Sequence, residues 1–310
     1  MIIKVLGSAA GGGFPQWNCN CANCADVRRK LPGLLPRTQS SLAVSSNARD
    51  WVLLNASPDL RQQLAANPEL SPSATAGARS SPIKAVVLTN GDIDHVAGLL
   101  NLREAQPFTL HASKRVLSAL AANPVFNVLD PGLVARLPLG LDQVAVLSGA
   151  GAALGLTVEM FAVPGKIALY LEDAAAGAGL GTRPGDTVGV RIHEPATDRA
   201  FFYIPGCAAV DTTLAARLTG AELVLFDGTL FTDDEMITAG LSAKTGQRMG
   251  HISMSGPGGS MAAFTPLGVR RRVFVHMNNS NPVLREGSRA RAAVEAGGWE
   301  VAFDGMEIRL

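Results

Sequence analysis

The sequence predicts a layered α+β protein, and three observations support that class. Short β-branched or aromatic runs bounded by Gly, Pro, Asn or Asp recur along the chain, as strands do. Segments with helical periodicity lie between them without strict alternation, which favours an α+β arrangement over a purely parallel sheet. No internal repeat or low-complexity linker divides the 310 residues, so we expect a single domain spanning residues 1–310.

The elements of the first half begin with a strand at residues 2–6, where β-branched residues lead into a glycine-rich loop. That loop does not fit a dinucleotide fingerprint, because Phe14 and Pro15 follow the glycines where a helix would have to begin. By the same criteria we expect strands at residues 41–45, 51–55, 85–89 and 108–111, and helices at 58–67, 96–103 and 113–122. Residues 71–82, rich in Ser, Ala, Gly and Pro, predict an exposed loop.

The second half continues with the same two patterns. Short β-branched or aromatic runs predict strands at residues 157–163, 167–171, 188–192, 200–204, 223–226, 273–276 and 307–310. Apolar residues at helical spacing predict helices at 212–218, 233–239, 259–265 and 288–296.

Composition excludes several classes of protein. Hydrophobic residues make up 47% and charged residues 17%, which fits a folded chain with a sizeable core. A net charge of +1 gives no field that would attract nucleic acid or an anionic membrane. The first residues lack the basic and apolar regions of a secretory signal, and the uncharged stretch between Asp142 and Glu159 is too short and too rich in Gly and Ala for a membrane span. We expect a cytoplasmic protein with no membrane insertion and no nucleic-acid partner; a homodimer stays open.

Three of the four cysteines, Cys19, Cys21 and Cys24, lie within six positions. Cysteines this close are poorly placed to pair with one another, and in a chain without an export signal they favour metal over disulfides. A structural zinc ion is normally closed by four ligands, so three thiolates need one more. Asn279, His251 and a water are candidates for it. The alternative is a surface loop with reduced, unoccupied thiols.

The turn after the apolar run at 83–89 carries Asp92, Asp94 and His95. Carboxylates and an imidazole on one strand-to-helix turn converge on a small volume, as catalytic metal ligands do. The same carboxylates would also suit the cap of the helix that follows. From the residues alone, the metal site and the helix cap are equally supported.

The other histidines are less informative by themselves. His276 ends the expected strand 273–276, and His251 lies in a loop beside a glycine. For either one alone, a hydrogen-bonded structural role is more common than ligation. His111 and His193 do not lie in a comparable motif, and we expect them to be structural.

The turn T-N-x-D-x-D-H-x-x-G at 89–98 resembles the T-H-x-H-x-D-H-x-x-G signature of the metallo-β-lactamase superfamily. The cysteine cluster and the glycine-rich loop are similar to the branch of phosphonate-pathway cyclic phosphodiesterases. Five further stretches resemble the B proteins of pyrroloquinoline quinone (PQQ) biosynthesis: residues 17–21, 55–60, 94–99, 163–166 and 276–282. The resemblance covers nearly the whole chain and implies a four-layer αββα sandwich.

The chain departs from the superfamily signature at several ligands. Asn90 and Asp92 stand where a hydrolase has its first two histidines, and no histidine occurs near residues 163–166. No bridging aspartate is apparent beside Cys207 unless that thiol, or the more distant Asp211 or Asp227, takes its place. A two-zinc hydrolytic centre is therefore hard to assemble, and one metal ion is easier.

The resemblance implies the residues of that single site: Asp92, Asp94, His95 and His276 as ligands. Two imidazoles with one or two carboxylates approximate the 2-His-1-carboxylate arrangement of non-haem iron, although zinc or manganese also fits. His251 would relay protons. The expected function is hydroxylation, in PQQ biosynthesis, of a precursor derived from tyrosine, with iron as cofactor and PQQ or its precursor as ligand. The alternatives are a non-catalytic carrier of PQQ or its precursor toward the periplasm, and a metal-dependent hydrolase.

Overall fold

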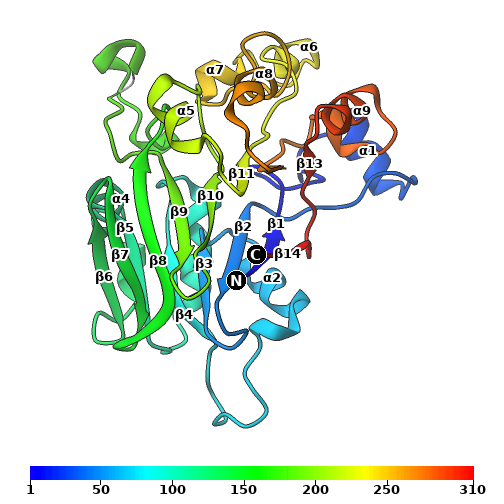
Figure 1. Ribbon diagram of the computed structural model, residues 1–310. Coiled ribbons are helices and arrows are strands. Elements are labelled where there is room, and N and C mark those ends of the chain that lie inside the picture. Colours follow the sequence, from blue (N-terminus) through cyan, green and yellow to red (C-terminus); the bar gives the residue numbers. More distant parts are fainter. Residues whose placement is uncertain (180) are drawn as a thin grey trace.

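The computed structural model describes residues 1–179 and 181–310 and shows two seven-stranded sheets packed face to face (Figure 1). The first sheet has the order β14-β1-β2-β3-β4-β5-β6. Its strands are β1 (Ile2–Gly7), β2 (Ser41–Ser45), β3 (Trp51–Leu54), β4 (Ile83–Val87), β5 (Phe108–Ser113), β6 (Val134–Leu139) and β14 (Glu307–Arg309). The outer part from β14 to β3 is antiparallel, and β3 to β6 run parallel.

The second sheet has the order β13-β12-β11-β10-β9-β8-β7. Its strands are β7 (Gln143–Gly149), β8 (Ala152–Ala162), β9 (Val188–Glu194), β10 (Arg199–Ile204), β11 (Leu223–Asp227), β12 (Arg271–Val275) and β13 (Glu300–Val301). Strands β7 to β10 are antiparallel, whereas β10 to β13 are parallel. Each sheet therefore has one parallel block, whose strands all end at the same edge.

Helices cover the outer faces of both sheets. The α-helices are α1 (Ala22–Arg28), α2 (Leu60–Ala66), α3 (Ile93–Val96), α4 (Lys114–Ala121), α5 (Thr212–Leu218), α6 (Glu235–Thr238), α7 (Gly246–Met249), α8 (Ser260–Phe264) and α9 (Arg289–Ala296). Short 3-10 turns include η1 (Pro68–Leu70), η2 (Ala97–Leu102), η3 (Pro124–Val128), η4 (Leu169–Leu171), η5 (Ala174–Gly179), η6 (Thr265–Leu267) and η7 (Pro282–Leu284). Within the described residues, no helix has the length and apolar character needed to cross a membrane.

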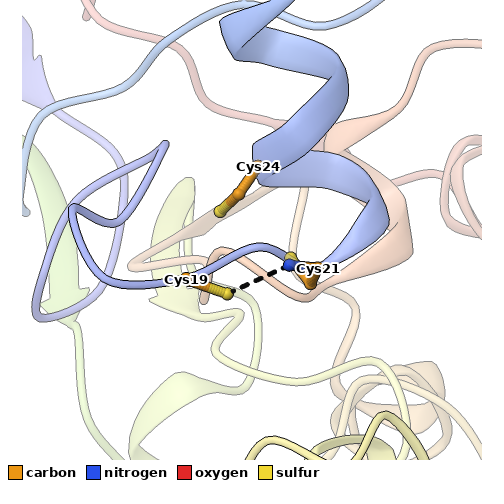
Figure 2. A group of neighbouring side chains, drawn as sticks. All are labelled: Cys19, Cys21 and Cys24. Atoms are coloured by element: carbon orange, nitrogen blue, oxygen red, sulfur yellow. Dashed lines mark hydrogen bonds between the residues drawn. The ribbon is translucent and has the colours of Figure 1, made fainter.

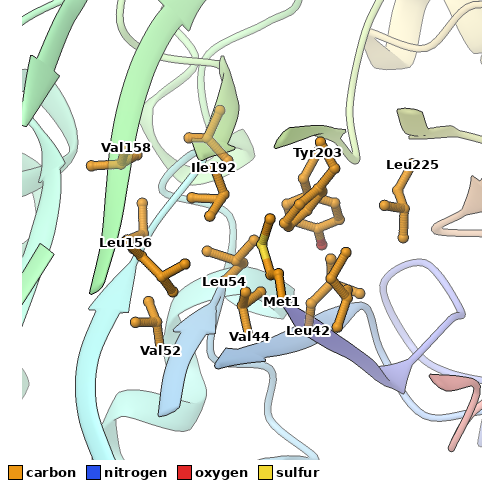
Figure 3. Close-up of a cluster of buried hydrophobic side chains, with 14 of the residues drawn as sticks. Met1, Leu42, Val44, Val52, Leu54, Leu156, Val158, Ile192, Tyr203 and Leu225 are labelled. Carbon is orange, nitrogen blue, oxygen red and sulfur yellow. The ribbon is translucent and has the colours of Figure 1, made fainter. Parts of the chain in front are cut away.

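Three hydrophobic clusters hold the layers together. The central cluster joins the inner faces of both sheets and includes Leu54 on β3, Val158 on β8 and Tyr203 on β10 (Figure 3). A second cluster packs α2, η2 and α4 on the first sheet, and a third packs α1, α5, α8 and α9 on the second. Together they confirm the expected αββα sandwich.

Strand β3 shows why the sequence folds this way. Its residues Val52 and Leu54 face the central cluster, while Trp51 and Leu53 face the helices of the first sheet. A strand buried on both faces needs a continuous apolar run rather than alternation, and residues 51–54 supply one. The expected strands that repeat this pattern, such as 85–89 and 223–226, are present with boundaries shifted by no more than a few residues.

The structure corrects some of the expected elements. Residues 167–171 were expected to form a strand and this is wrong: they contain the 3-10 turn η4, because Leu169 and Tyr170 are exposed and pair with no neighbouring strand among the described residues. The hairpin of β7 and the first half of β8 was missed, since its glycines and alanines resemble a loop. Helix α1 was also not predicted, because the cysteines in and before it indicated a metal-binding loop.

Candidate metal centres

The parallel blocks of the two sheets bring the expected site residues to one place. Strand β4 ends at Val87 and leads through Thr89 into α3, which carries Asp94 and His95. In the second sheet β11 ends at Asp227, and His276 directly follows its parallel neighbour β12. Ligand sites form outside the carboxyl ends of parallel strands, and here two such ends face each other.

Two contacts fix the turn that carries Asp94 and His95. The buried Asn55, in a left-handed conformation with φ 63°, accepts from the amide of Thr89 at 2.9 Å and donates to its hydroxyl at 2.9 Å. Gly98 lies against the backbone of residues 56–57, where an added β-carbon would come within 2.1 Å of the Ser57 oxygen. The glycine of the H-x-x-G motif is therefore needed for this close approach.

The structure assembles two groups of donor atoms that share one histidine. Asp94 Oδ2 lies 3.1 Å from His276 Nε2 and 3.8 Å from His95 Nε2. Asp227, His251 and His276 form the second group, and the donor atoms of each group lie within 4.8 Å of one another. Among the residues described, four of the five expected catalytic residues therefore converge: Asp94, His95, His251 and His276.

The three imidazoles are oriented in the same way. His95 Nδ1 lies 2.7 Å from Asn90 Oδ1, His276 Nδ1 lies 2.9 Å from Thr229 Oγ1, and His251 Nδ1 lies 2.7 Å from Asp227 Oδ2. An acceptor at Nδ1 can hold a proton there and direct Nε2 toward a cation, as the outer shell of a metal site does. In His276, Nε2 instead contacts Asp94 Oδ2 at 3.1 Å, a position that a cation between the two groups would take over. Asn90, in the position of a superfamily histidine, thus orients the imidazole of His95.

Thr229 links both groups. Its hydroxyl donates to Asp227 Oδ1 at 2.7 Å and accepts from His276, so its single proton is already used by the aspartate. Asp227 Oδ2 also accepts from the amide of Cys207 at 2.9 Å. The sequence indicated Asp227 only as a distant substitute for a bridging aspartate and gave no signal for Thr229. Parallel pairing of β10 with β11, and of β11 with β12, brings them to the site.

The charged groups perturb one another strongly. Burial lowers the pKa of His95 to about 4, with the nearby Asp94 carboxylate opposing the shift. Burial would raise the pKa of Asp94, but the charges of His95 and His276 and the hydrogen bond to His276 outweigh it and hold that pKa below its ordinary value. His95 Nε2 is buried and has no hydrogen-bond partner. A buried lone pair facing a carboxylate fits a cation bound between them.

Asp92 lies beside these groups rather than in them. It lines the same cavity of about 270 Å³, together with Lys166 and Lys244, but its carboxylate belongs to neither donor group. Burial and the charge of Asp94 raise its pKa to about 6. It occupies the cap position of α3 without accepting a capping hydrogen bond, so the helix-cap interpretation is wrong for this residue. A ligand role for Asp92 stays a prediction.

The cysteine cluster lies apart from this cavity. Cys19 and Cys21 precede α1 and Cys24 lies in its first turn, and the three sulfur atoms lie within 4.8 Å of one another (Figure 2). Burial raises the pKa of Cys24 to about 12, so a thiolate there needs a compensating cation. Asn279 Nδ2 lies 3.1, 3.6 and 3.3 Å from the sulfurs of Cys19, Cys21 and Cys24. The set fits one tetrahedral zinc ion, with the Asn279 amide turned to offer its oxygen.

The remaining candidates are placed elsewhere. His251 bonds to Asp227 in the cavity and belongs to the second donor group, so of the two protein candidates for the fourth ligand only Asn279 touches the sulfurs. Asp211 caps α5 through the amide of Leu214, and the Cys207 thiol donates to a backbone carbonyl. His111 and His193 belong to neither donor group among the described residues.

Comparisons with known proteins concern the family and the fold of the chain. A profile described as a beta-lactamase superfamily domain matches residues 50–277. Coenzyme PQQ synthesis protein B of Xanthomonas oryzae pv. oryzae is 52% identical over 310 residues, covering 100% of both chains. The protein of the same name from Methylobacterium nodulans is 53% identical over 306 residues, covering 99% of each chain.

Solved structures extend the comparison. The Zn²⁺-bound PqqB of Methylobacterium extorquens has a TM-score of 0.94 and 50% identity, with 100% of both chains covered. A diphosphatase of the PhnP family, 17% identical with a TM-score of 0.68 over 100% of this chain and 97% of its own, shares the fold. This chain belongs to the coenzyme PQQ synthesis protein B family of the beta-lactamase superfamily.

Proposed function

We propose that the chain acts in PQQ biosynthesis as a metal-dependent hydroxylase of the tyrosine-derived precursor. Its full-length relatives are named for PQQ synthesis, and one of them binds Zn²⁺. The single observation that carries the chemistry is the common orientation of the three imidazoles, each with Nδ1 held by a protein oxygen.

Asp94, His95 and His276 are the residues that would hold the catalytic ion. Two imidazole nitrogens and one carboxylate on one side of an ion leave its other positions open, and this donor set suits Fe(II). An iron ion bound there would supply the activation of O₂. The second, cysteine-held cation would be a structural zinc, with Cys19, Cys21 and Cys24 as ligands.

The cavity walls suit an aromatic substrate that carries carboxylates. Lys166 and Lys244 place two ammonium groups on the wall, and Leu169 and Met249 add apolar surface. Lys166 is paired with Glu172 at 2.9 Å, whereas Lys244 has no ion pair with any residue that the structure describes. Lys244 is therefore the cation that a substrate carboxylate would meet. His251, with its Nδ1 proton committed to Asp227, keeps Nε2 as the atom that accepts and returns a proton.

The test is a single-turnover assay of protein loaded anaerobically with Fe(II). On addition of O₂, a dihydroxyphenylalanine-like substrate and ascorbate as the two-electron reductant that releases the second oxygen atom as water, we expect hydroxylated product from the wild type and none from Asp94→Asn. Asp198→Asn is the matched control, because that carboxylate is 95% exposed and lies at a turn beyond β9. Binding of the substrate without any product would support a carrier of PQQ or its precursor instead.

A second candidate function follows from the group of Asp227, His251 and His276. This group lies beside the first and shares His276, so it offers a second position for a cation, and metal-dependent hydrolases use ions held by such donors. Turnover of a chromogenic phosphodiester with added Zn²⁺ or Mn²⁺, abolished in Asp227→Asn, would support hydrolysis over hydroxylation.

A further inference from the structure

The segment 276–281 connects the two candidate metal centres. His276 lies at one end in the first donor group, and Asn279, three residues later, touches the three sulfurs. His276 has φ 60°, a left-handed conformation that residues with a β-carbon adopt uncommonly. The contacts that impose it decide where the imidazole points.

Contacts from α1 hold the far end of this segment. Asn23 lies between Cys21 and Cys24 and is buried, and its Nδ2 donates to the carbonyl oxygens of Asn279, Ser280 and Asn281 at 3.3, 3.2 and 3.0 Å. The sulfurs therefore contact the segment through the side chain of Asn279, and Asn23 holds it by hydrogen bonds to its backbone. Both sets of contacts come from the seven-residue helix α1 and the cysteines in and before it.

The near end of the segment is held by the site itself. The amide of Met277 donates to Ser8 at 2.9 Å, and its carbonyl accepts from Ala10 at 2.7 Å. The amide of Asn278 donates to the Thr229 carbonyl at 2.9 Å. With both ends fixed, the segment has little freedom, so a shift of α1 is transmitted to His276.

We propose that Asn23 and the three cysteines form a clamp that fixes His276 in its left-handed conformation, so that a cation on the sulfurs strengthens cation binding by Asp94, His95 and His276. A cation draws three thiolates together and thereby sets the position of α1. Without it nothing draws the three sulfurs together, and the clamp loosens. The inference rests on the proposed metal centre, and Asn23 acts in it as a positioning residue.

Linkage makes the coupling reciprocal: each cation raises the affinity for the other by the same factor. Changes in groups that orient metal ligands typically weaken binding by about 10- to 100-fold. We expect about a tenfold effect for Asn23→Ala, because the contacts to Ser8, Ala10 and Thr229 remain.

The experiment uses full-length protein with Zn²⁺ on the cysteines and titrates Co²⁺ into the His276 group, followed by the visible absorption of Co²⁺ bound to nitrogen and oxygen. Asn23→Ala should bind this Co²⁺ about tenfold more weakly while elemental analysis still finds zinc. Asn67→Ala is the matched control: Asn67 is also buried and donates to a backbone carbonyl, at 2.7 Å, on α2. It should leave Co²⁺ affinity unchanged. Equal affinity in Asn23→Ala and the wild type, or equal weakening in both variants, would overturn the inference.

A second measurement covers a variant that fails to fold. In wild-type protein, a mercurial reagent displaces the cation from the cysteines, and Co²⁺ affinity at the His276 group is measured before and after. A loss of affinity supports the clamp, and an unchanged affinity refutes it. A wild type that binds no Co²⁺ at the three donors under either condition refutes the proposed centre as a whole, so the two failures differ.

Discussion

Replacing Asn90 with leucine removes the oxygen that orients His95. Asn90 Oδ1 lies 2.7 Å from His95 Nδ1, and the ring is 1% exposed, so water cannot replace the lost acceptor. A buried N–H without a partner costs about 1–3 kcal/mol. The proton is then free to move to Nε2, the atom that has to be unprotonated to bind a cation.

Thr89 limits the size of this effect. Its Oγ1 lies 3.4 Å from the same nitrogen and can recover part of the lost hydrogen bond. We therefore expect Asn90→Leu to weaken Co²⁺ binding about tenfold, which corresponds to about 1.4 kcal/mol. Asn90→Asp keeps an acceptor of the same length and should bind at least as tightly as the wild type.

The assay is Co²⁺ titration of zinc-loaded protein, with near-UV circular dichroism as a check that the fold is kept. If Asn90→Leu binds Co²⁺ as tightly as the wild type, then Asn90 does not orient the ligand.

Three further predictions concern packing, pH and substrate. An added β-carbon at Gly98 would lie 2.1 Å from a backbone oxygen, so Gly98→Ala should lower the free energy of unfolding, measured in urea, by about 1–3 kcal/mol. Gly77→Ala is the control, because Gly77 has open space around it and its substitution should not lower that free energy. Equal urea midpoints of unfolding for the two variants would contradict this prediction. Burial lowers the pKa of His111 from 6.5 in the unfolded chain to about 4 in the folded protein. As the pH falls, the unfolded chain therefore binds the proton first. Up to about 3 kcal/mol of stability, which is fully present above pH 6.5, is lost as the pH falls toward 4. His111→Gln should flatten that part of the pH–stability curve, and an unchanged slope would count against a buried neutral imidazole. Lys244→Met should raise the dissociation constant for PQQ about tenfold but leave that for its trimethyl ester unchanged. Lys114→Met, which lies outside the cavity, is the control. Equal losses of affinity for the acid and the ester in Lys244→Met would exclude recognition of a carboxylate by this lysine.

The sequence predicts the parts of this protein that depend on local patterns. Apolar runs bounded by turn residues identify the buried strands, because a strand covered on both faces has to be apolar throughout, as residues 51–54 are. The turn at 89–98 identifies Asp94 and His95, because its glycine and its charged residues are adjacent in the chain. The exposed loop expected at 71–82 is confirmed, and its signal was likewise local: Ser, Ala, Gly and Pro residues adjacent in the chain.

The rest depends on contacts between distant segments. Asp227 and Thr229 reach the cavity only because β10, β11 and β12 run parallel and end together, and no local signal announces that pairing. The role of Asn90 is visible only once the His95 ring is placed. The incorrect strand at 167–171 has the same origin, since Leu169 lines the cavity and Tyr170 and Leu171 are exposed, and none of these residues pairs with a strand of the described sheets.

The candidate centre draws its donors from both halves of the sandwich. Asp94 and His95 follow a strand of the first sheet, and Asp227, His251 and His276 belong to the part of the chain that builds the second. A nascent chain that has reached only β6 therefore carries Asp94 and His95 but lacks the donors of the second sheet. Binding of an ion by donors from both sheets would require the two halves to have packed together, and the bound ion would then stabilise their interface.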